Sequence, residues 1–496
     1  MKKLNYKTLE EINYQGYILK DAKERIIQFG EGNFLRAFVD CFIDEMNEKA
    51  NFNSKVVVVQ PIENQFLHET INKQEGLYTL YLRGYQEGQQ VSKKRVISCI
   101  SRCLDPKEEY DEILNCADNP DLRFVISNTT EAGIVYDSSC KLEDNFASSF
   151  PGKLTQFLYR RFQTFKQGFG MVILSCELID NNGNELKRCV LEYAKQWKLE
   201  PAFIDWIHKE NIFCSTLVDR IVTGYPRSEV DALNKEQGYQ DDLIDTAEIF
   251  GFWAIEGPSV LANELPFKEA NCPVIITDNQ TPYKQRKVRI LNGAHTSFVL
   301  GAYLSGQDIV VDCMNDPVIQ EFMNNTIYKE IIPTLSLNEE ELNTFAKSVY
   351  ERFKNPFIKH KLLDISLNST SKWKARVLPS LKKYIDINND LPPHICASFA
   401  FYLAFYKGYR YENSTLWGKR KQDDYPIRDD EKVLQFFLNH RDDTLENYIE
   451  AVCKNEELWQ EDLTEIPNFK QQVLLYLKII INKGAYELMK YVNHKE

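Results

Sequence analysis

A lysine, an asparagine and a histidine lie close together in segment 287–295, and their residue types suit proton transfer to a carbonyl oxygen. The segment reads Lys287-Val-Arg-Ile-Leu-Asn292-Gly-Ala-His295. A lysine that is desolvated beside an apolar ring has a pKa below its ordinary value of about 10.4, and it can then donate a proton near neutral pH. An asparagine can hold an oxygen on which negative charge develops, and a histidine can orient a neighbouring hydroxyl. The three types together suit the reduction of a ketone.

The spacing of these three residues is compatible with one broad side of a helix. At 100° per residue, Asn292 lies ~140° around an α-helix from Lys287, and His295 lies a further ~60° away. The alternative is a surface lysine, an asparagine at a helix cap and a histidine satisfied in the core. Spacing alone leaves both interpretations open.

A glycine turn in segment 25–37 has the features of a phosphate-binding turn. Arg25-Ile-Ile-Gln-Phe29 predicts a short strand, and Gly30-Glu-Gly32 follows it directly. Gly30 permits a tight turn, and Gly32 lets backbone N–H groups approach a pyrophosphate at the positive end of the next helix. The strand before the turn and the helix after it strengthen a pattern that is weak alone. The alternative is a tight turn that binds nothing.

The end of the second strand favours NAD over NADP as the dinucleotide. An acidic residue usually follows this strand and bonds the adenosine ribose, but here Val59 precedes Gln60-Pro-Ile-Glu63. Gln60 can bond a ribose hydroxyl through its amide, and Glu63 is near in sequence. No Arg or Lys follows in this loop, so a 2′-phosphate finds no obvious partner.

The order of predicted elements indicates an α/β fold with a Rossmann-like, doubly wound parallel sheet. Short apolar runs predict strands, and apolar residues at helical spacing predict helices between them. The strands are expected at 25–29, 55–59, 123–127 and 171–176, and the helices at 34–46, 107–116 and 153–165. After about Pro282, long amphipathic segments dominate. We therefore predict an NAD-binding domain over 1–280 and a mostly helical substrate and catalytic domain over 281–496.

Composition excludes several classes of protein. The 496 residues include 60 Lys+Arg and 72 Asp+Glu, a net charge of −12, which argues against nucleic acid or an anionic membrane as a partner. The longest apolar stretch, 395–406, is too short to span a bilayer, and no apolar segment typical of a secretion signal follows the N-terminus. The twelve Cys are scattered singly, as expected of free thiols in a reducing cytoplasm. No spacing of His or Cys proposes a metal site, so no metal is predicted.

Taken in order along the chain, several stretches resemble the mannitol dehydrogenase family of polyol-specific long-chain dehydrogenases, whose hallmark is K-x4-N-x2-H. The resemblance spans most of the chain. The agreeing stretches are Lys287 to His295, the G-x-G-x-F-x-R-A turn at Gly30 to Ala37, Thr130 to Gly133, Ser175 to Glu177 with Asn182-Gly183, Thr216 to Ile221, and Asn355-Pro356 with Lys372.

The resemblance implies a role for each matching residue. Lys287 is expected to be the general acid in reduction and the general base in oxidation, Asn292 the partner of the oxyanion, and His295 a group that orients the substrate. Asp219 matches an active-site aspartate. The residues expected to bind NAD(H) are Gly30, Gly32, Asn33, Phe34, Arg36, Gln60, Thr130 and Glu131.

One departure from the family bears on the substrate. Mannitol dehydrogenases have Asp-Asn where this chain has Glu177-Leu178, which removes one donor to the oxyanion and speaks against a plain hexitol. Within the family, the chain is most similar to members that act on hexuronates. The resemblance thus implies reversible reduction of a sugar acid, D-tagaturonate, to D-altronate with NADH, between the two domains. The alternatives are reduction of fructuronate, oxidation of a mannitol-type polyol and, from another class, a nucleotide-binding protein without chemistry.

A uronate carries a carboxylate, so its site should supply a cation. Candidates in the helical half are Lys359, His360, Lys372 and Arg376, and Lys372 leads because it matches a basic position of the family's substrate site. The alternative is that these groups are solvated or paired on the surface. The sequence sets no oligomeric state, and a monomer is compatible with it.

Overall fold

A computed structural model describes residues 1–61, 67–129 and 133–495, and in it the chain divides into two units. Unit 1 comprises Met1–Arg83 and Gln89–Gln280, and unit 2 comprises Gly84–Gly88 and Thr281–Glu496. All twelve cysteines lie in the described residues, and each is a buried free thiol, as their scatter predicts. Within the described ranges, no helix combines the length and the apolar character needed to cross a membrane.

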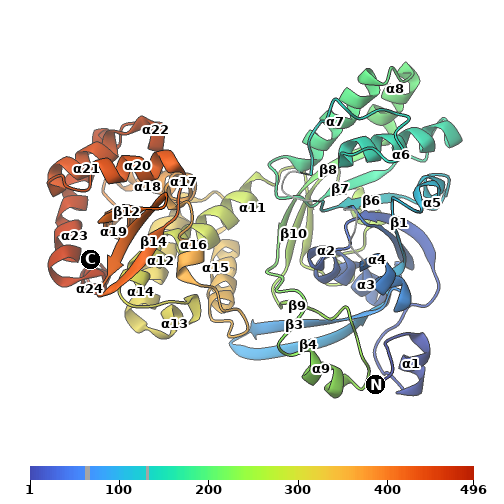
Figure 1. The fold of residues 1–496 in the computed structure, drawn as a ribbon, viewed down its shortest axis with the longest axis horizontal. Helices are drawn as coiled ribbons and strands as arrows, with labels where there is room; N and C mark the ends of the chain where they lie inside the picture. Colours follow the sequence, from blue (N-terminus) through green and yellow to red (C-terminus); the bar gives the residue numbers. More distant parts are fainter. Residues whose placement is uncertain (62–66, 130–132, 496) are drawn as a thin grey trace. The chain divides into compact units, whose positions relative to one another are not determined.

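Unit 1 contains an eight-stranded sheet with the order β11-β10-β8-β7-β6-β1-β2-β5. Figure 1 labels β10, β8, β7, β6 and β1 of this sheet. The strands from β5 to β8 run parallel, and β10 pairs antiparallel with β8. In chain order the parallel strands are arranged 3-2-1-4-5-6, which is the order of the doubly wound dinucleotide fold. The predicted fold class is confirmed. The strands are β1 (Lys23–Phe29), β2 (Ser54–Val59), β5 (Ile100–Leu104), β6 (Phe124–Ser127), β7 (Val172–Ser175), β8 (Ile212–Asp219), β10 (Phe252–Glu256) and β11 (Val274–Thr277).

Helices cover both faces of this sheet, which explains why its strands lack polar alternation. Ile27 and Val57 belong to a core with one set of helices, and Ile26 and Val56 belong to a second core with α3 (Val39–Ala50) on the other face. The helices of the first face are α5 (Tyr110–Cys116), α6 (Phe150–Phe165), α7 (Asn182–Gln196) and α8 (Pro201–Glu210), visible together in Figure 1. Further helices of unit 1 are α1 (Tyr6–Glu11), α4 (Leu67–Lys73), α9 (Val230–Gln237) and α10 (Leu261–Glu264).

The single helix expected after the glycine turn is two helices, α2 (Asn33–Ala37) and α3 (Val39–Ala50). Phe38 separates them with φ −119° and ψ −75°, and its N–H bonds to the carbonyl of Leu35, only three residues back. The ring of Phe38 is fully buried against Trp253. Burial of this ring therefore overrides the continuous helical periodicity of the segment.

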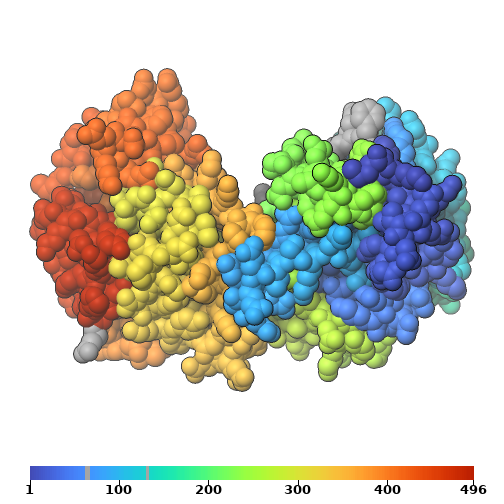
Figure 2. All heavy atoms as spheres, turned by 90° about the horizontal axis from the view of Figure 1, so that it is seen from below, coloured from blue at the N-terminus to red at the C-terminus, as the bar shows by residue number. Residues whose placement is uncertain are grey.

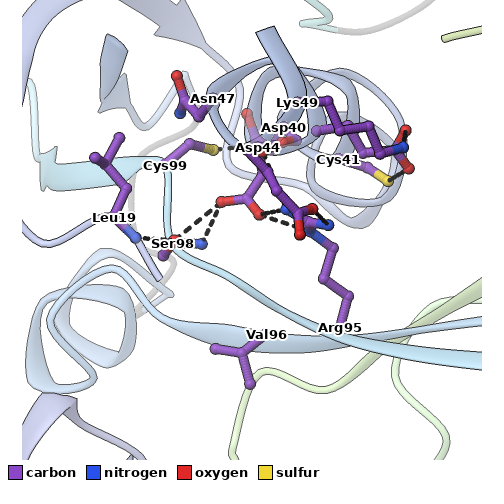
Figure 3. Close-up of polar contacts among 12 residues, drawn as sticks. Leu19, Asp40, Cys41, Asp44, Asn47, Lys49, Arg95, Val96, Ser98 and Cys99 are labelled. Atoms are coloured by element: carbon purple, nitrogen blue, oxygen red, sulfur yellow. Dashed lines mark hydrogen bonds and ion pairs between the residues drawn. The ribbon is translucent and has the colours of Figure 1, made fainter. Parts of the chain in front are cut away.

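A three-stranded sheet that the sequence did not predict has the order β4-β3-β9, with β3 at Tyr78–Gln86, β4 at Gln89–Ile97 and β9 at Asp245–Glu248. A buried network links its strand β4 to α3 (Figure 3). Arg95 of β4 forms an ion pair of 2.6 Å with Asp44 of α3, whose side chain is fully buried. The other carboxylate oxygen of Asp44 accepts hydrogen bonds from the backbone N–H of Ser98, at 2.9 Å, and from its hydroxyl, at 3.0 Å.

Asp40, one turn before Asp44, is expected to make stability depend on pH. Burial raises the pKa of Asp40 to about 7, against smaller opposing effects of Gln28, Arg36 and Tyr78. Because the pKa of Asp40 is higher in the folded protein, its carboxyl group stabilises the folded protein relative to a permanently ionised one. This stabilisation is fully present below the unfolded-state pKa of about 3.9 and is lost as pH rises through 7. We expect Asp40→Asn, which mimics the neutral acid, to gain stability over the wild type by up to ~1.4 kcal/mol per pH unit between pH 5 and 7. Urea unfolding at pH 5, 6, 7 and 8 measures this, and a constant difference between the two proteins would contradict it.

Unit 2 is mostly helical, as predicted. Helices α12 (Gly293–Leu304) and α19 (Pro393–Tyr406) are buried along almost their whole lengths and form its core. The C-terminal helix α24 (Ala485–Asn493) packs against α23 (Phe469–Lys483) and lies beside the segment near residue 320 (Figure 2), where Asn493 donates a hydrogen bond of 3.0 Å to the carbonyl of Val318. A small antiparallel sheet, β12 (Arg410–Glu412), β13 (Thr415–Arg420) and β14 (Asp423–Ile427), is an exception to the helical prediction.

The other elements of unit 2 carry or support the segments of chemical interest. They are α11 (Thr281–Arg286), the π-helix η1 (Lys287–Asn292), α13 (Val310–Asn315), α14 (Pro317–Asn325), the π-helix η2 (Thr326–Ile331), η3 (Ile332–Thr334), α15 (Glu339–Phe353), α16 (Leu362–Ile365), α17 (Ser369–Arg376), α18 (Leu378–Asn388), α20 (Glu431–Asn439), α21 (Leu445–Lys454), α22 (Glu456–Trp459) and η4 (Leu463–Glu465).

Candidate functional site

The glycine turn between β1 and α2 leaves space for an anionic group. Gly30 has φ +137°, and a Cβ there would lie 2.8 Å from Leu35 Cδ1 and 3.0 Å from the carbonyl oxygen of Asn128, so only glycine fits. Gly32 is the N-cap of α2; among the described residues no side chain caps the helix there, and a Cβ built on Gly32 would meet nothing within 4 Å. The space beside Gly32 at the start of this helix is compatible with the approach of a dinucleotide phosphate.

Of the side chains that follow the two glycines, Arg36 points into the protein, whereas Asn33 is exposed. Arg36 is 2% exposed; it donates from Nε to the carbonyl of Glu31, at 3.1 Å, and from Nη1 to that of Leu243, at 2.8 Å. Arg36 therefore braces the turn from inside, and its expected part in cofactor binding stays a prediction. Asn33 bonds to Arg36, and the ring of Phe34 stacks on Phe38. Because Gly32 and Asn33 are exposed, this part of the turn can meet a ligand.

A hollow of about 630 Å³ lies at the carboxyl ends of β1, β2 and β6, where α/β sheets bind nucleotides. Its walls combine the rings of Phe29 and Phe150 with polar groups from Thr129 and Lys153. This volume is typical of small-molecule sites, and rings with hydroxyls suit a nucleoside. Gln60 is buried at the end of β2 next to this hollow's wall at Pro61. The expected residues Thr130 and Glu131 lie outside the described residues.

Glu177 is a residue whose contribution the sequence did not reveal. Its carboxylate is 3% exposed and accepts hydrogen bonds from the Thr129 N–H, at 3.2 Å, and from the hydroxyls of Thr129 and Ser127. Burial raises the pKa of Glu177. The adjacent Leu178 is 67% exposed. Glu177 therefore fixes the wall of the hollow at Thr129.

Asp219, the expected active-site aspartate, ends β8 in unit 1 and is 5% exposed. Its neighbour Arg220 donates to the carbonyl of Ala37, at 2.6 Å, and to that of Phe250, at 2.9 Å. These bonds fix the strand end on which Asp219 stands.

In unit 2, the expected Lys287 and Asn292 delimit the π-helix η1, and His295 lies in the first turn of α12. A π-helix has i→i+5 hydrogen bonds, so residues five apart lie about one turn from each other. The angle of ~140° expected for an α-helix between Lys287 and Asn292 is therefore too large. The extra residue in this turn brings the two side chains towards one face, both of them half-buried.

His295 is held by rings and is not the satisfied core histidine of the alternative interpretation. Its ring stacks on Phe353, with centroids 4.1 Å apart and 15° between planes, and lies edge-on to His360. Its Nε2 is buried and has no hydrogen-bond partner among the described residues. Burial, followed by the nearby charges of His360, Arg352 and others, lowers the pKa of His295 well below its ordinary value. The neutral ring can thus bond a ligand.

The groups whose charges lower the pKa of His295 form a basic cluster, which consists of Arg352, His360, Lys372 and Arg376. Burial lowers the pKa values of His360, Lys372 and Arg376. Of the predicted cations, Lys359 is instead exposed. Arg352 was not predicted from the sequence, and the signal that could have identified it is its place beside Phe353 and Asn355-Pro356.

Comparisons with known proteins cover both units. The family models described as the mannitol dehydrogenase Rossmann domain and the mannitol dehydrogenase C-terminal domain match residues 24–269 and 279–481. Altronate oxidoreductases of Shigella flexneri and of Escherichia coli (strain K12) are each 45% identical over 493 residues, or 98% of this chain and 99% of theirs.

Two solved structures share the fold over its full length. A D-sorbitol dehydrogenase in substrate-free form has a TM-score of 0.83 at 23% identity, covering 99% of this chain and 100% of that one. The mannitol 2-dehydrogenase of Pseudomonas fluorescens, in a ternary complex with NAD and D-mannitol, has a TM-score of 0.69 at 20% identity and covers 100% of both chains.

Proposed function

The chain belongs to the mannitol dehydrogenase family, and on that premise we propose that it is an altronate oxidoreductase that interconverts D-tagaturonate and D-altronate. It is an NAD-dependent oxidoreductase acting on a CH–OH group, as expected from the sequence. The choice of a hexuronate as substrate and the roles of individual residues are the proposal.

The basic cluster around His295 is the observation that favours a sugar acid over a neutral polyol. Desolvating cations costs free energy unless an opposite charge approaches them. Burial is the cause of the lowered pKa of Arg376, and it is the largest cause for Lys372 and His360. An anionic substrate would offset this cost, whereas a hexitol would not.

Lys287, Asn292 and His295 would act on the carbonyl oxygen and its neighbours. In reduction, Nζ of Lys287 would give a proton to the oxygen that becomes the hydroxyl, and in oxidation it would take that proton back. The amide N–H of Asn292 would donate to the same oxygen as negative charge develops. Because η1 brings the side chains of Lys287 and Asn292 towards one face, both would be able to contact the carbonyl oxygen of the substrate. His295, neutral and with an unused Nε2, would orient a substrate hydroxyl.

NADH would supply the hydride, and unit 1 would hold it. The turn at Gly30 and Gly32 would receive the pyrophosphate, and the hollow beside Gln60 would receive the adenosine. Thr130, Glu131 and Asp219 remain predicted site residues.

Steady-state kinetics with NADH and three ketoses tests the proposed function. We expect kcat/KM for D-tagaturonate to exceed that for D-fructose by at least about tenfold, since a lost charge-assisted contact costs roughly that factor. Activity with NADPH should be lower. Equal or better turnover of D-fructose would contradict the sugar acid, and a preference for D-fructuronate would favour the alternative reduction. Binding of NADH without turnover of any ketose would favour a protein without chemistry.

A further inference from the structure

The last turn of α17 lies directly against the helix that carries the lysine, asparagine and histidine. A Cβ built on Gly293 would lie 3.3 Å from the backbone carbonyl oxygen of Arg376, so the missing side chain permits this close approach. Nη1 of Arg376 lies 3.5 Å from Oγ1 of Thr296, the residue after His295. The guanidinium is thus placed beside the candidate site by backbone packing within unit 2.

The other cations of the cluster with described surroundings already face partners. Nζ of Lys372 donates to the carbonyl of Ile365 at 2.9 Å, and the carboxylate of Asp429 raises its pKa against the larger effect of burial. The carboxylate of Asp364 acts on His360 in the same way.

Arg376 differs from both. Its contact with Thr296 is at the outer limit of a hydrogen bond, and no carboxylate pairs with it among the residues that the structure describes. Four of its five N–H donors therefore remain for a ligand. A guanidinium presents two parallel N–H donors that match the two oxygens of a carboxylate, whereas an ammonium acts as a point charge.

The geometry points to Arg376 as the residue that binds the carboxylate of the sugar acid. This inference rests on the proposed function and changes the order of candidates, since the sequence favoured Lys372. It also explains the glycine at position 293, whose missing side chain lets α17 place Arg376 at the site.

The test compares Arg376→Gln with the matched variant Lys372→Gln. For each, kcat/KM is measured with D-tagaturonate and with D-tagatose, the sugar that lacks the carboxylate. For Arg376→Gln, we expect the ratio of kcat/KM for tagaturonate to kcat/KM for tagatose to fall by about 10- to 100-fold, because a charge-assisted contact is lost. The fall should come from a higher KM for tagaturonate. Arg376→Lys should restore part of the ratio. Lys372→Gln should change the ratio by less than Arg376→Gln does.

Binding measurements separate recognition from structural damage. The dissociation constants of NADH and of D-altronate in the presence of NADH are measured for the wild type and Arg376→Gln, and only that of altronate should rise. Equal loss with tagatose and tagaturonate, or a larger selective loss in Lys372→Gln, would overturn the inference. If the wild type prefers fructuronate, the proposed function fails, whereas a selective loss of fructuronate in Arg376→Gln would still support Arg376 as the anchor.

Discussion

Replacement of Lys287 by alanine is expected to lower kcat for reduction of the ketose by about 10²- to 10⁴-fold, the usual contribution of a general acid. The proton for the carbonyl oxygen would then have to come from water. The affinity for NADH should stay unchanged, because the expected cofactor residues lie in unit 1. Stopped-flow and steady-state rates at saturating NADH and ketose, with NADH binding followed by fluorescence, measure both quantities.

Lys347→Ala provides the matched control for this variant. Lys347 is an exposed lysine of α15 in the same unit, so its loss removes one charge from the surface. It should retain the wild-type kcat. A Lys287→Ala protein with kcat within threefold of the wild type would refute the role assigned to this lysine.

Replacement of Asp44 by alanine is expected to lower the free energy of unfolding by about 3–5 kcal/mol, since it removes one partner of a buried ion pair. Asp44 is fully buried, Arg95 is 21% exposed at its side chain, and the N–H of Ser98 would lose its acceptor as well. Urea unfolding at pH 7, followed by circular dichroism, measures the change.

A double-mutant cycle isolates the pair itself. Asp44→Ala, Arg95→Ala and the double variant are compared, and the double variant should lose less than the sum of the two single changes. Additive losses would mean that the two side chains act independently, and a loss below 1 kcal/mol for Asp44→Ala would contradict the expected cost.

Four strands of the eight-stranded sheet were predictable because they are short apolar runs between glycines and helices. Strands β1, β2, β6 and β7 lie within two residues of the ranges expected from the sequence. The sheet β12–β14 was not predictable, because 410–427 has no β-branched run. Cation–π contacts contribute to holding this sheet in place. Arg410 lies over Trp417, and Arg420 lies over Tyr303, which is more than 100 residues away in sequence.

The residue types of the candidate site were predictable, but their surroundings were not. The spacing of Lys287, Asn292 and His295 identified a chemical set without a structure. The burial of Arg36 could not be read locally, because its partner carbonyl at Leu243 lies some 200 residues further along the chain. Likewise, the choice between Lys372 and Arg376 depends on which cation already faces a carboxylate, and this is a matter of tertiary contacts.

The π-helix η1 has one residue more in its turn than an α-helix would have. In an α-helix, a lysine and an asparagine four residues apart share one face, and in η1 Lys287 and Asn292 do so five residues apart. The added residue changes the register of the preceding helix, because it rotates α11 by roughly 100° about the helix axis relative to α12. The four residues between lysine and asparagine in K-x4-N therefore keep the two side chains on one face. An alignment that removed one of these four residues would shift the whole of α11 by one position.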